Sequence, residues 1–326
     1  MKAILINEIT KELYIDEVIK PTIKSDEILV QVQATALNRA DLLQKKGLYP
    51  PPPGASPILG LEMAGTIVEV GNEVPDYKIG DRVFALLSGG GYAEYITVSA
   101  KLAMPIPENL SFEQAAAIAE AFLTAYQALC WLGKLKPQEK VLIHAGASGV
   151  GSAAIQIVRE FGARAFVTVG TEKKQQLCQS LGAELAINYR KESFLEKIYQ
   201  LTENKGVDII LDCIGVNYWQ SNITSLALDG RLIIIASMSG SLVEKVNLAE
   251  ILKRRLQIIG TTLRNRSLEY KIRLTQDFSQ FALTRFSNNQ LTPVIDQIFP
   301  WQEVNQAHQY LEDNLNAGKI VLKITT

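Results

Sequence analysis

A glycine-rich turn near the middle of the chain has the residue types and the spacing that can hold phosphate groups. An apolar strand, a tight turn and an amphipathic helix follow one another between Lys140 and Phe161, and Gly162 stands where a helix C-cap is expected. Glycines let a backbone approach phosphates closely, while the free N–H groups and the dipole of a first helical turn favour negative charge. This order of elements predicts that the turn binds the pyrophosphate of a dinucleotide.

The match of this turn to a dinucleotide fingerprint is incomplete. Against the pattern G-x-G-x-x-G the chain has Gly146, Ser148 and Gly151, with an additional glycine at Gly149. Glycine turns that bind nothing also join strands to helices, so the turn alone does not decide between a phosphate site and a plain connection. If it is a phosphate site, the backbones of Ser148, Gly149 and Val150 are expected to face the pyrophosphate.

The elements that follow the turn favour the phosphate site. Apolar strands alternate with helices, and the expected strands lie near residues 141–144, 164–169, 185–189, 207–213, 231–236 and 256–260. Near-continuous apolar strands separated by helices indicate a parallel sheet that is covered on both faces. Such strands after a phosphate loop predict a doubly wound (Rossmann) dinucleotide domain.

The segments before and after this region have a different pattern. Short β-strands separated by proline and glycine turns suggest a partly closed barrel or sandwich in the first third, with strands near residues 27–34, 65–70 and 91–98 and a short helix at 39–46. A helix capped by Ser111 is expected to run to about Trp131. The last segment is expected to complete the first sheet, with helices at 268–286 and 302–314 and strands around Pro293 and at 319–324.

The composition is that of a globular protein of ordinary charge. With 326 residues the chain is long for one core, so two domains are expected. A net charge of −1 gives no electrostatic reason to expect nucleic acid or an acidic membrane as a partner. No apolar run approaches the roughly 18 residues of a membrane span, and the first apolar run is too short for a signal peptide. The 3 cysteines are widely spaced, which favours a reducing compartment and predicts a cytoplasmic protein.

Short motifs along the chain resemble one family. They are Asn38-Arg-Ala-Asp41, Gly47-Leu-Tyr-Pro50, Leu59-Gly-Leu-Glu62, Ile79-Gly-Asp-Arg-Val83, Gly91-Tyr-Ala-Glu94, Leu123-Thr-Ala-Tyr126, the turn from His144 to Gly151, and Gly318-Lys-Ile-Val-Leu322. In this order they are similar to the zinc-free quinone oxidoreductases of the medium-chain dehydrogenase/reductase superfamily, and most similar to the zeta-crystallin-like branch. The resemblance implies an α/β fold, with a GroES-like β-rich catalytic domain (1–122 and 264–326) and an inserted Rossmann domain that binds NADPH (123–263).

The resemblance also bears on metal binding. It places Asn38, Leu61 and Glu120 where the zinc alcohol dehydrogenases of the superfamily have a cysteine, a histidine and a further cysteine or acid. Asparagine and leucine cannot replace a thiolate and an imidazole around Zn²⁺, which prefers tetrahedral nitrogen and sulfur ligands. We therefore expect no metal. Hydride delivery to an acceptor that is already electrophilic needs mainly positioning and charge stabilisation.

The end of the second Rossmann strand bears on the choice of cofactor. NAD sites usually place an acid there to hold the ribose 2′-hydroxyl, whereas this chain has Gly170. Lys174, one helical turn later, can meet a 2′-phosphate, and Tyr189 resembles a family tyrosine that helps to hold it. Glu172 stands at about the spacing of the NAD acid, but it is expected to lie already in the following helix, where an acid is ordinary. NADPH is the expected cofactor.

Three residues are candidates for the catalytic pocket. Tyr49 resembles a tyrosine that lines the quinone pocket, although it could equally pack on the prolines that follow it. Asn38 is expected to hydrogen-bond the substrate or the nicotinamide side, rather than only shape a turn. Thr124 resembles the family residue beside the nicotinamide, although a helix threonine can also bond back to its own backbone. Asp41 and Glu62 could be acid and base, but a structural role is preferred for both because quinone reduction can take protons from water.

Further cofactor contacts are expected where the later strands end. Cys213 follows the fourth strand and is expected to flank the adenosine or ribose, while the residues after the fifth and sixth strands are expected near the nicotinamide: Ser237, Met238, Leu263 and Arg264. Asn316 precedes the closing strand and is a further candidate. His144 lies within the first strand and is expected to be a satisfied core histidine.

These residues favour an NADPH-dependent quinone oxidoreductase that acts on a small molecule without zinc, as a homodimer by family resemblance. Gln257 to Gly260 is the strand edge expected to pair, because an uncovered apolar edge strand invites association. One alternative is a reductase of enals, enones or enoyl thioesters, which needs a proton donor such as Tyr49. Another is an NADPH-binding sensor or structural protein with incidental turnover. The fold alone cannot choose among these.

Overall fold

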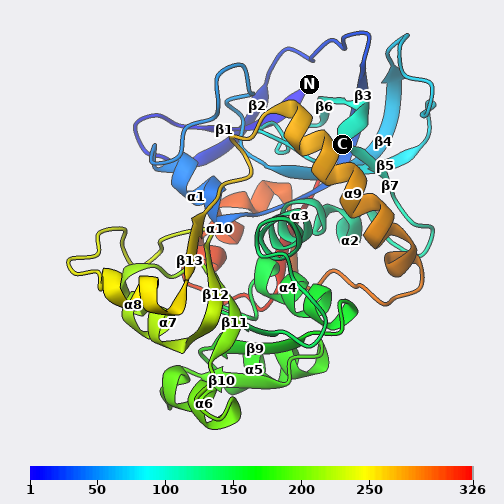
Figure 1. The fold of residues 1–326 in the computed structure, drawn as a ribbon. Coiled ribbons are helices and arrows are strands. Elements are labelled where there is room, and N and C mark those ends of the chain that lie inside the picture. Colours follow the sequence, from blue (N-terminus) through cyan, green and yellow to red (C-terminus); the bar gives the residue numbers. More distant parts are fainter. Residues whose placement is uncertain (325–326) are drawn as a thin grey trace. The chain divides into compact units, whose positions relative to one another are not determined.

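A computed structural model describes residues 1–324, which fall into two units, each built on one large sheet (Figure 1). One unit contains Met1–Leu123 and the chain from Leu263 onwards, and the other contains Thr124–Thr262. The chain therefore leaves the first unit once and returns to it.

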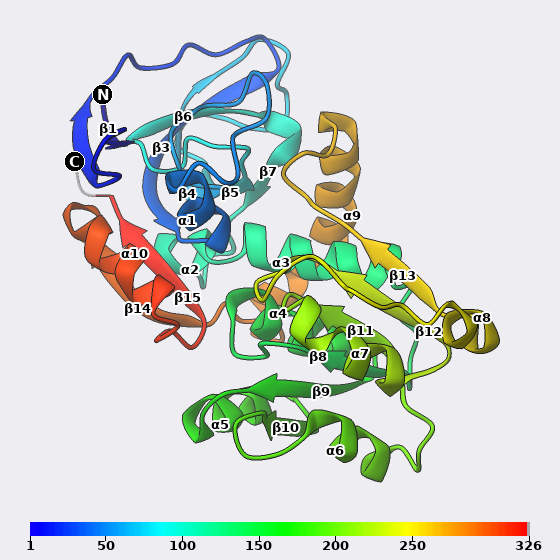
Figure 2. The same cartoon turned by 90° about the vertical axis from the view of Figure 1, so that its left-hand side faces the viewer.

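The second unit is built on one parallel sheet. In the described part of the chain its strand order is β10-β9-β8-β11-β12-β13. The elements are β8 (Lys140–Ile143), α4 (Gly149–Glu160), β9 (Arg164–Val169), α5 (Glu172–Ser180), β10 (Leu185–Asn188), α6 (Phe194–Leu201), β11 (Val207–Asp212), α7 (Trp219–Ser225), β12 (Leu226–Ile234), α8 (Leu248–Arg254) and β13 (Gln257–Gly260). Figure 2 shows these strands side by side. The strand order reverses between β8 and β11, which confirms the predicted doubly wound sheet.

Apolar side chains from the sheet and its helices form the core of this unit. Leu142, Phe166 and Ile210 come from three adjacent strands and are fully buried, as is Ile198 from α6. Burying such a side chain contributes roughly 1.5–3 kcal/mol relative to leaving it in water. The apolar runs that predicted these strands are thus the residues that hold the sheet between its helices.

The first unit is built on a mixed, mostly antiparallel sheet. Its order in the described residues is β14-β15-β3-β4-β5-β7, with β6 also paired to β3, while β1 and β2 form a separate pair. The elements are β1 (Lys2–Ile6), β2 (Leu13–Glu17), β3 (Glu27–Ala36), α1 (Arg39–Lys45), β4 (Glu62–Val70), β5 (Arg82–Leu86), β6 (Tyr95–Ser99), β7 (Ala103–Pro105), α2 (Phe112–Ala116), α9 (Leu268–Ser287), β14 (Ile295–Pro300), α10 (Val304–Glu312) and β15 (Lys319–Lys323). Strand β15 pairs antiparallel with β3, so the last segment completes the first sheet as expected.

The prediction of one helix from Ser111 to about Trp131 is wrong. Ser111 does cap α2 through a capping box, but α2 ends at Ala116, and α3 (Ala119–Tyr126) begins anew before a π-helical stretch, η2 (Gln127–Leu132). The backbone N–H of Glu120 donates to Glu62 Oε2 over 2.8 Å instead of to the carbonyl one turn before it. A side chain on β4 therefore accepts the hydrogen bond that a backbone carbonyl of α2 would accept if the helix were continuous.

Two expected strands begin later than predicted. Gly91 and Tyr92 were expected in a strand, but their N–H groups donate to the carbonyls of Gly60 and Leu59 in a loop, and β6 starts at Tyr95. Pro293 was expected inside a strand, but β14 starts at Ile295. A proline has no N–H to donate to a neighbouring strand, which fits its place just before β14.

Candidate dinucleotide site and candidate active site

The glycine turn after β8 is shaped by close backbone approaches. A Cβ on Gly146 would lie 2.6 Å from Val167 Cβ, and a Cβ on Gly151 would lie 2.3 Å from the Ala145 carbonyl oxygen. Ser148 is the N-cap of α4, and its Oγ accepts the Gly151 N–H over 3.0 Å. Gly149 and Val150 then form the first turn of α4, where N–H groups lack partners within the helix. The structure thus brings Ser148, Gly149 and Val150 together at a helix N-terminus that suits a phosphate.

The end of β9 meets the end of β10. A Cβ on Gly170 would lie 2.7 Å from Tyr189 Oη and 3.4 Å from Arg190 Nε, so only a glycine leaves this space open. Lys174 lies in the first turn of α5, where its N–H donates to Thr171 Oγ1. The structure therefore places Gly170, Lys174 and Tyr189 around one strand end. It adds Arg190, which was not predicted from the sequence, although a basic residue directly after the expected third strand was a usable signal.

Glu172 is engaged away from its own helix. It is the first residue of α5, which confirms that it lies within the helix. Its carboxylate is exposed and lies 2.5 Å from Lys191 Nζ, and the hydrogen bond from Lys191 lowers the pKa of Glu172. Lys191 is a competing partner for the carboxylate that would hold a ribose hydroxyl in an NAD site.

The loops after β11 and β12 lie against each other. The Met238 N–H donates to the Cys213 carbonyl oxygen over 3.2 Å, and a Cβ on Gly215 would lie 3.0 Å from Ser237 Cα. Asp212 shapes this turn by accepting the N–H groups of Ile214 and Gly215. Cys213, Ser237 and Met238 are thereby brought together beyond the carboxyl ends of the neighbouring strands β11 and β12.

His144 is a satisfied core histidine, as expected. Its Nδ1 lies 3.0 Å from Thr168 Oγ1, and its Nε2 lies 2.7 Å from Asn222 Oδ1. Burial lowers the pKa of His144 to about 4, so the ring is neutral near pH 7.

A buried ion pair lies at the centre of the first unit. Lys319 on β15 is 5% exposed, and its Nζ lies 2.7 Å from Glu62 Oε1 on β4. The same ammonium donates to the Leu37 carbonyl oxygen over 2.8 Å and to Asn38 Oδ1 over 2.7 Å. Asn38 Nδ2 donates to Glu62 Oε1 and to the Ala36 carbonyl oxygen. Both donor hydrogens of the Asn38 amide are used inside this unit, so it holds the pair in place and has only acceptor capacity left for a ligand.

These residues do not fit zinc. Of the three positions that the family resemblance aligns with zinc ligands, Asn38 is bonded to an ammonium group, Leu61 is a buried aliphatic residue and Glu120 is a single carboxyl. Within residues 1–324, no group of three or more His, Cys, Asp and Glu side chains is arranged to hold a metal ion.

Two more carboxyls lie close to this pair. Asp41 is 1% exposed, and its carboxylate accepts the N–H groups of Asn38 and Gly60 over 2.8 and 3.0 Å. Burial nevertheless raises the pKa of Asp41 to about 6. Burial and the neighbouring Glu62 raise the pKa of Glu120 to about 7. Asp41 and Glu62 have structural hydrogen bonds, as expected, whereas no sequence signal singled out Glu120 as a titrating group.

Tyr49 lies against a cation rather than only against prolines. The Arg264 guanidinium carbon lies 5.3 Å from the centre of the Tyr49 ring. Arg264 is 5% exposed and donates to Gln44 Oε1 over 2.6 Å and to the Ser88 carbonyl oxygen over 2.9 Å. Lys271, from α9, donates to Ser88 Oγ over 2.8 Å. Arg264 and Lys271 therefore meet at Ser88, and Tyr49 lies against Arg264. Lys271 was not predicted from the sequence, because only its contact with Ser88 in the folded chain places it beside these residues.

The remaining candidates have varied surroundings. Leu263 is buried. Asn316 Nδ2 donates to the Gly318 carbonyl oxygen over 2.7 Å and so closes a local turn. Thr124 lies in α3 with a buried hydroxyl oxygen that has no hydrogen-bond partner among the described residues. A buried hydroxyl without a partner is costly unless a ligand or water completes it.

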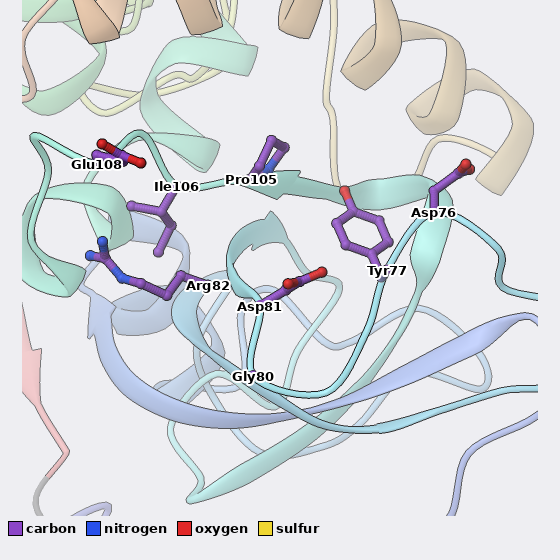
Figure 3. A pocket seen from close by; sticks show the side chains of 8 residues that line it. All are labelled: Asp76, Tyr77, Gly80, Asp81, Arg82, Pro105, Ile106 and Glu108. Carbon is purple, nitrogen blue, oxygen red and sulfur yellow. The ribbon is translucent and has the colours of Figure 1, made fainter.

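A pocket of about 500 Å³ lies elsewhere in the first unit (Figure 3). Its lining residues are Asp76, Tyr77, Gly80, Asp81, Arg82, Pro105, Ile106 and Glu108. Arg82 donates to the Leu110 carbonyl oxygen over 2.6 Å and covers the Phe112 ring, and Tyr77 donates to the Ala103 carbonyl oxygen. These bonds join β5, β7 and the start of α2, and none of the candidate site residues lines the pocket.

Comparison of the sequence with known families and proteins shows clear similarities. Residues 24–108 match the family model described as "Alcohol dehydrogenase GroES-like domain", and residues 149–284 match the one described as "Zinc-binding dehydrogenase". The quinone oxidoreductase of Homo sapiens is 32% identical over 307 residues, which are 93% of this chain and 90% of that protein. The chain belongs to the quinone oxidoreductase family of medium-chain dehydrogenases and reductases. It is thus an oxidoreductase with a fold that binds a nicotinamide dinucleotide.

Solved structures and longer relatives extend this comparison. The Escherichia coli quinone oxidoreductase complexed with NADPH has a TM-score of 0.88 at 29% identity, covering 99% of this chain and 100% of that one. The CurK enoyl reductase has a TM-score of 0.88 at 28% identity, covering 99% of each chain. A phenolphthiocerol/phthiocerol polyketide synthase of Mycobacterium tuberculosis is 30% identical over 96% of this chain, but the chain spans only 14% of its length.

No helix among residues 1–324 is both long and apolar enough to cross a membrane.

Proposed function

We propose that this chain is an NADPH-dependent quinone oxidoreductase that works without zinc. The observation that carries the proposal is the Lys319 ammonium bonded to both Asn38 and Glu62. These polar groups are satisfied by one another, so the zinc-type Lewis acid that alcohol oxidation uses in relatives has no ligand set here. An acceptor that is already electrophilic does not need such a metal.

The choice of NADPH is supported by the cations around Gly170. Lys174 and Arg190 follow the ends of β9 and β10, and Tyr189 adds a hydroxyl beside the open space at Gly170. Guanidinium and ammonium groups are the usual partners of phosphate oxygens. We assign the 2′-phosphate to these residues and the pyrophosphate to the backbones of Ser148, Gly149 and Val150. The residues after the other strands, Cys213, Ser237, Met238, Leu263, Arg264 and Asn316, are proposed to line the rest of the cofactor site.

The chain's own residues orient the reactants and exclude water. When bound, the dinucleotide supplies the hydride. Tyr49, stacked on Arg264, offers a flat aromatic face to a quinone ring, and the guanidinium stabilises negative charge that develops on the acceptor. Thr124 has a free hydroxyl for a hydrogen bond to a ligand. Asn38 positions Glu62 and Lys319, and we propose that it contributes its remaining acceptor capacity.

An alkene reductase is the second candidate, because the CurK enoyl reductase has the same fold. Such a reaction needs a proton donor beside the alkene. Burial raises the pKa of the Tyr49 phenol, so this hydroxyl stays protonated at neutral pH. The third candidate, a sensor or structural protein that binds NADPH, predicts binding without turnover.

We propose that the protein is a homodimer in the reducing cytoplasm. Strand β13 is the edge of its sheet, and Ile258 on it is 37% exposed. Leu248 and Leu252, in the adjacent α8, are also exposed. An edge strand with apolar neighbours suits pairing with a second copy. The three cysteines are widely spaced along the sequence, which supports a reducing compartment.

One assay separates the three candidates. NADPH oxidation is measured with 1,2- and 1,4-naphthoquinone and with an enone, after exhaustive chelation and beside an NADH control. Rapid turnover with the quinones that resists chelation supports the proposal. Turnover with the enone alone supports the alkene reductase, and NADPH binding without turnover supports the sensor or structural protein.

A further inference from the structure

Three carboxyls interact electrostatically with the Lys319 ammonium, and they do not have the same partners. Glu62 accepts hydrogen bonds from Lys319, from the Asn38 amide and from the Glu120 N–H. Asp41 accepts the N–H groups of Asn38 and Gly60. The Glu120 carboxyl has no hydrogen bond or ion pair with any residue in the described part of the chain. Of the three, it is the carboxyl that is left to interact with a ligand or with water.

The surroundings of Glu120 favour its protonated form. Glu62 and Asp41 are like charges beside it, and together with burial they raise the pKa of Glu120. Lys319 and Arg264 act in the opposite direction, but they do not offset the burial and the two carboxylates. With its pKa at about 7, the group both holds and releases a proton near neutral pH.

Glu120 lies among the side chains proposed to bind the acceptor. It acts electrostatically on Tyr49, on Arg264 and on Lys271, which come from the loop after α1, the chain before α9 and α9 itself. Thr124 follows Glu120 by four residues in α3, so the two side chains lie on the same helix face. The buried Thr124 hydroxyl lacks a partner among the described residues, which is an independent sign that a ligand completes this face.

The bond between Glu120 and Glu62 fixes the position of the acid. Because Glu62 Oε2 accepts the Glu120 N–H, α3 begins at this point and not as a continuation of α2. Glu62 is held by Lys319 and Asn38, so the start of α3 is tied to β4, β15 and α1. A catalytic acid needs such a fixed support.

We propose that Glu120 is the acid that protonates the reduced acceptor. This inference rests on the proposed function. Hydride transfer from the reduced nicotinamide cofactor turns a quinone into a hydroquinone monoanion. The Glu120 O–H bond then breaks, a new O–H bond forms on the anionic oxygen, and the carboxylate takes a proton from water. One hydride and one proton give the neutral hydroquinone. Arg264 and Lys271 stabilise the anion before the proton arrives.

The variant Glu120→Gln keeps the shape of the side chain and removes the acidic proton. Turnover of NADPH with 1,4-naphthoquinone is measured between about pH 5 and about pH 9, together with the solvent isotope effect. In the wild type, kcat falls as the pH rises through about 7, because the acid form is lost. In the variant this fall is absent and kcat at low pH is reduced roughly 100-fold. The Kd for NADPH, measured by fluorescence titration, stays the same.

Glu113→Gln is the matched control. Glu113 lies in α2, and its carboxylate is 3.3 Å from Lys323 Nζ. This variant is expected to keep the wild-type pH profile. Glu120→Asp retains an acid and is expected to restore the falling limb at a lower rate. It also keeps the test decisive if Glu120→Gln does not fold.

Infrared spectroscopy detects the protonated form of the Glu120 carboxyl without catalytic turnover. The cofactor-free wild type is expected to lose a protonated-carboxyl band with a midpoint near pH 7, and Glu113→Gln is expected to do the same. Glu120→Gln loses that component and keeps the one from Asp41, whose pKa is about 6. If the wild type turns over quinones but Glu120→Gln keeps its pH profile, this inference alone is overturned. If the wild type turns over no quinone, the proposed function is overturned, and this inference with it.

Discussion

Lys319 joins side chains and backbone from several elements through one ammonium group. It bonds to Glu62 and Asn38 and to the Leu37 carbonyl, and it is 5% exposed. A buried pair of this kind adds little net stability compared with apolar residues, but removing one partner leaves the other charge buried without compensation. The residue therefore matters most through what its loss would do to Glu62.

Replacing Lys319 by methionine tests this at the residue scale. Lys319→Met is expected to lower the free energy of unfolding by about 3–5 kcal/mol, because the buried Glu62 carboxyl loses its cationic partner. Urea unfolding measures the change. Lys323→Met, on the same strand but with an exposed side chain, is the control and is expected to change stability by less than about 0.5 kcal/mol. Equal small losses in both variants would contradict the role of the ammonium.

Replacing Lys174 tests whether the protein prefers NADPH to NADH. Lys174→Ala is expected to raise the Kd for NADPH roughly 10- to 100-fold, which is the usual effect of losing a charged hydrogen bond, and to leave NADH binding nearly unchanged. Fluorescence titration with both dinucleotides measures this. Lys173→Ala, the exposed neighbour, is the control. Equal losses for NADPH and NADH would remove Lys174 from the 2′-phosphate site.

Replacing Tyr49 tests whether this residue contacts the quinone. Tyr49→Ala is expected to raise the quinone KM about tenfold, because the flat ring stacked on Arg264 is lost, while the Kd for NADPH stays the same. Steady-state kinetics with a naphthoquinone measures the change. Tyr14→Ala, at an exposed tyrosine of β2, should leave both values unchanged. An unaltered KM in Tyr49→Ala would leave the residue with a packing role only.

At the scale of elements, β13 and the neighbouring α8 are predicted to form the dimer interface. Strand β13 pairs only with β12 among the described strands, so its other edge is open. Ile258→Lys is expected to convert a dimer into a monomer, because a charge on an edge strand opposes pairing. Light scattering after size-exclusion chromatography measures the mass. Ile19→Lys, at an exposed isoleucine in the first unit, is the control. A dimer that survives Ile258→Lys places the interface elsewhere.

Most elements of the second unit were predictable because their signals are local, although α7 and the first five residues of β12 were not predicted. Apolar runs mark β8 to β13, and the caps at Ser148, Thr171 and Ser193 lie directly before their helices. The break between α2 and α3 was not predictable in this way. It depends on Glu62, which is 58 residues away along the chain and takes the Glu120 N–H. A long-range bond of this kind leaves no pattern in the residues around the break.

The candidate site residues also differ in whether their signals are local or depend on contacts between distant segments. Gly170 and Lys174 were predicted from their places at and after the end of the second strand, and Tyr189 was predicted from the family resemblance. Lys271 and the acid role of Glu120 were missed, because the first depends on Ser88 and the second on burial and on two other carboxyls. Their chemistry arises where elements pack together, and neither residue is unusual in its own segment.

At the scale of the whole molecule, buried titratable groups set how stability varies with pH. Burial raises the pKa of Asp41 to about 6 and, with Glu62, that of Glu120 to about 7. Burial lowers the pKa of His144 to about 4 and that of His308 to about 3. The carboxyls bind protons more tightly in the folded state, so their contribution falls as the pH rises, whereas the histidines act with the opposite sign up to about pH 6.5.

Glu120→Gln isolates one of these contributions. The cost of ionising Glu120 is absent below its unfolded pKa of 4.5 and fully present above about 7. The variant is therefore expected to gain about 2–3 kcal/mol relative to the wild type as the pH rises across this window. Urea unfolding at about pH 5 and about pH 8 measures the difference. A difference that does not change with pH would contradict the raised pKa of Glu120.

The divided first unit has a consequence for how the protein is made. Strand β3 needs β15 as its partner, and Ala36 pairs with Val321, which is synthesised 285 residues later (321 minus 36). At roughly 5–20 residues per second, the ribosome delivers that partner about 15–60 seconds after β3 has emerged. The second unit, in contrast, is contiguous from Thr124 to Thr262 and has all its strands before then. The inserted unit can thus finish folding first. Until β15 is made, residues 34–36 of β3 lack their partner strand, whereas residues 27–31 can already pair with β6.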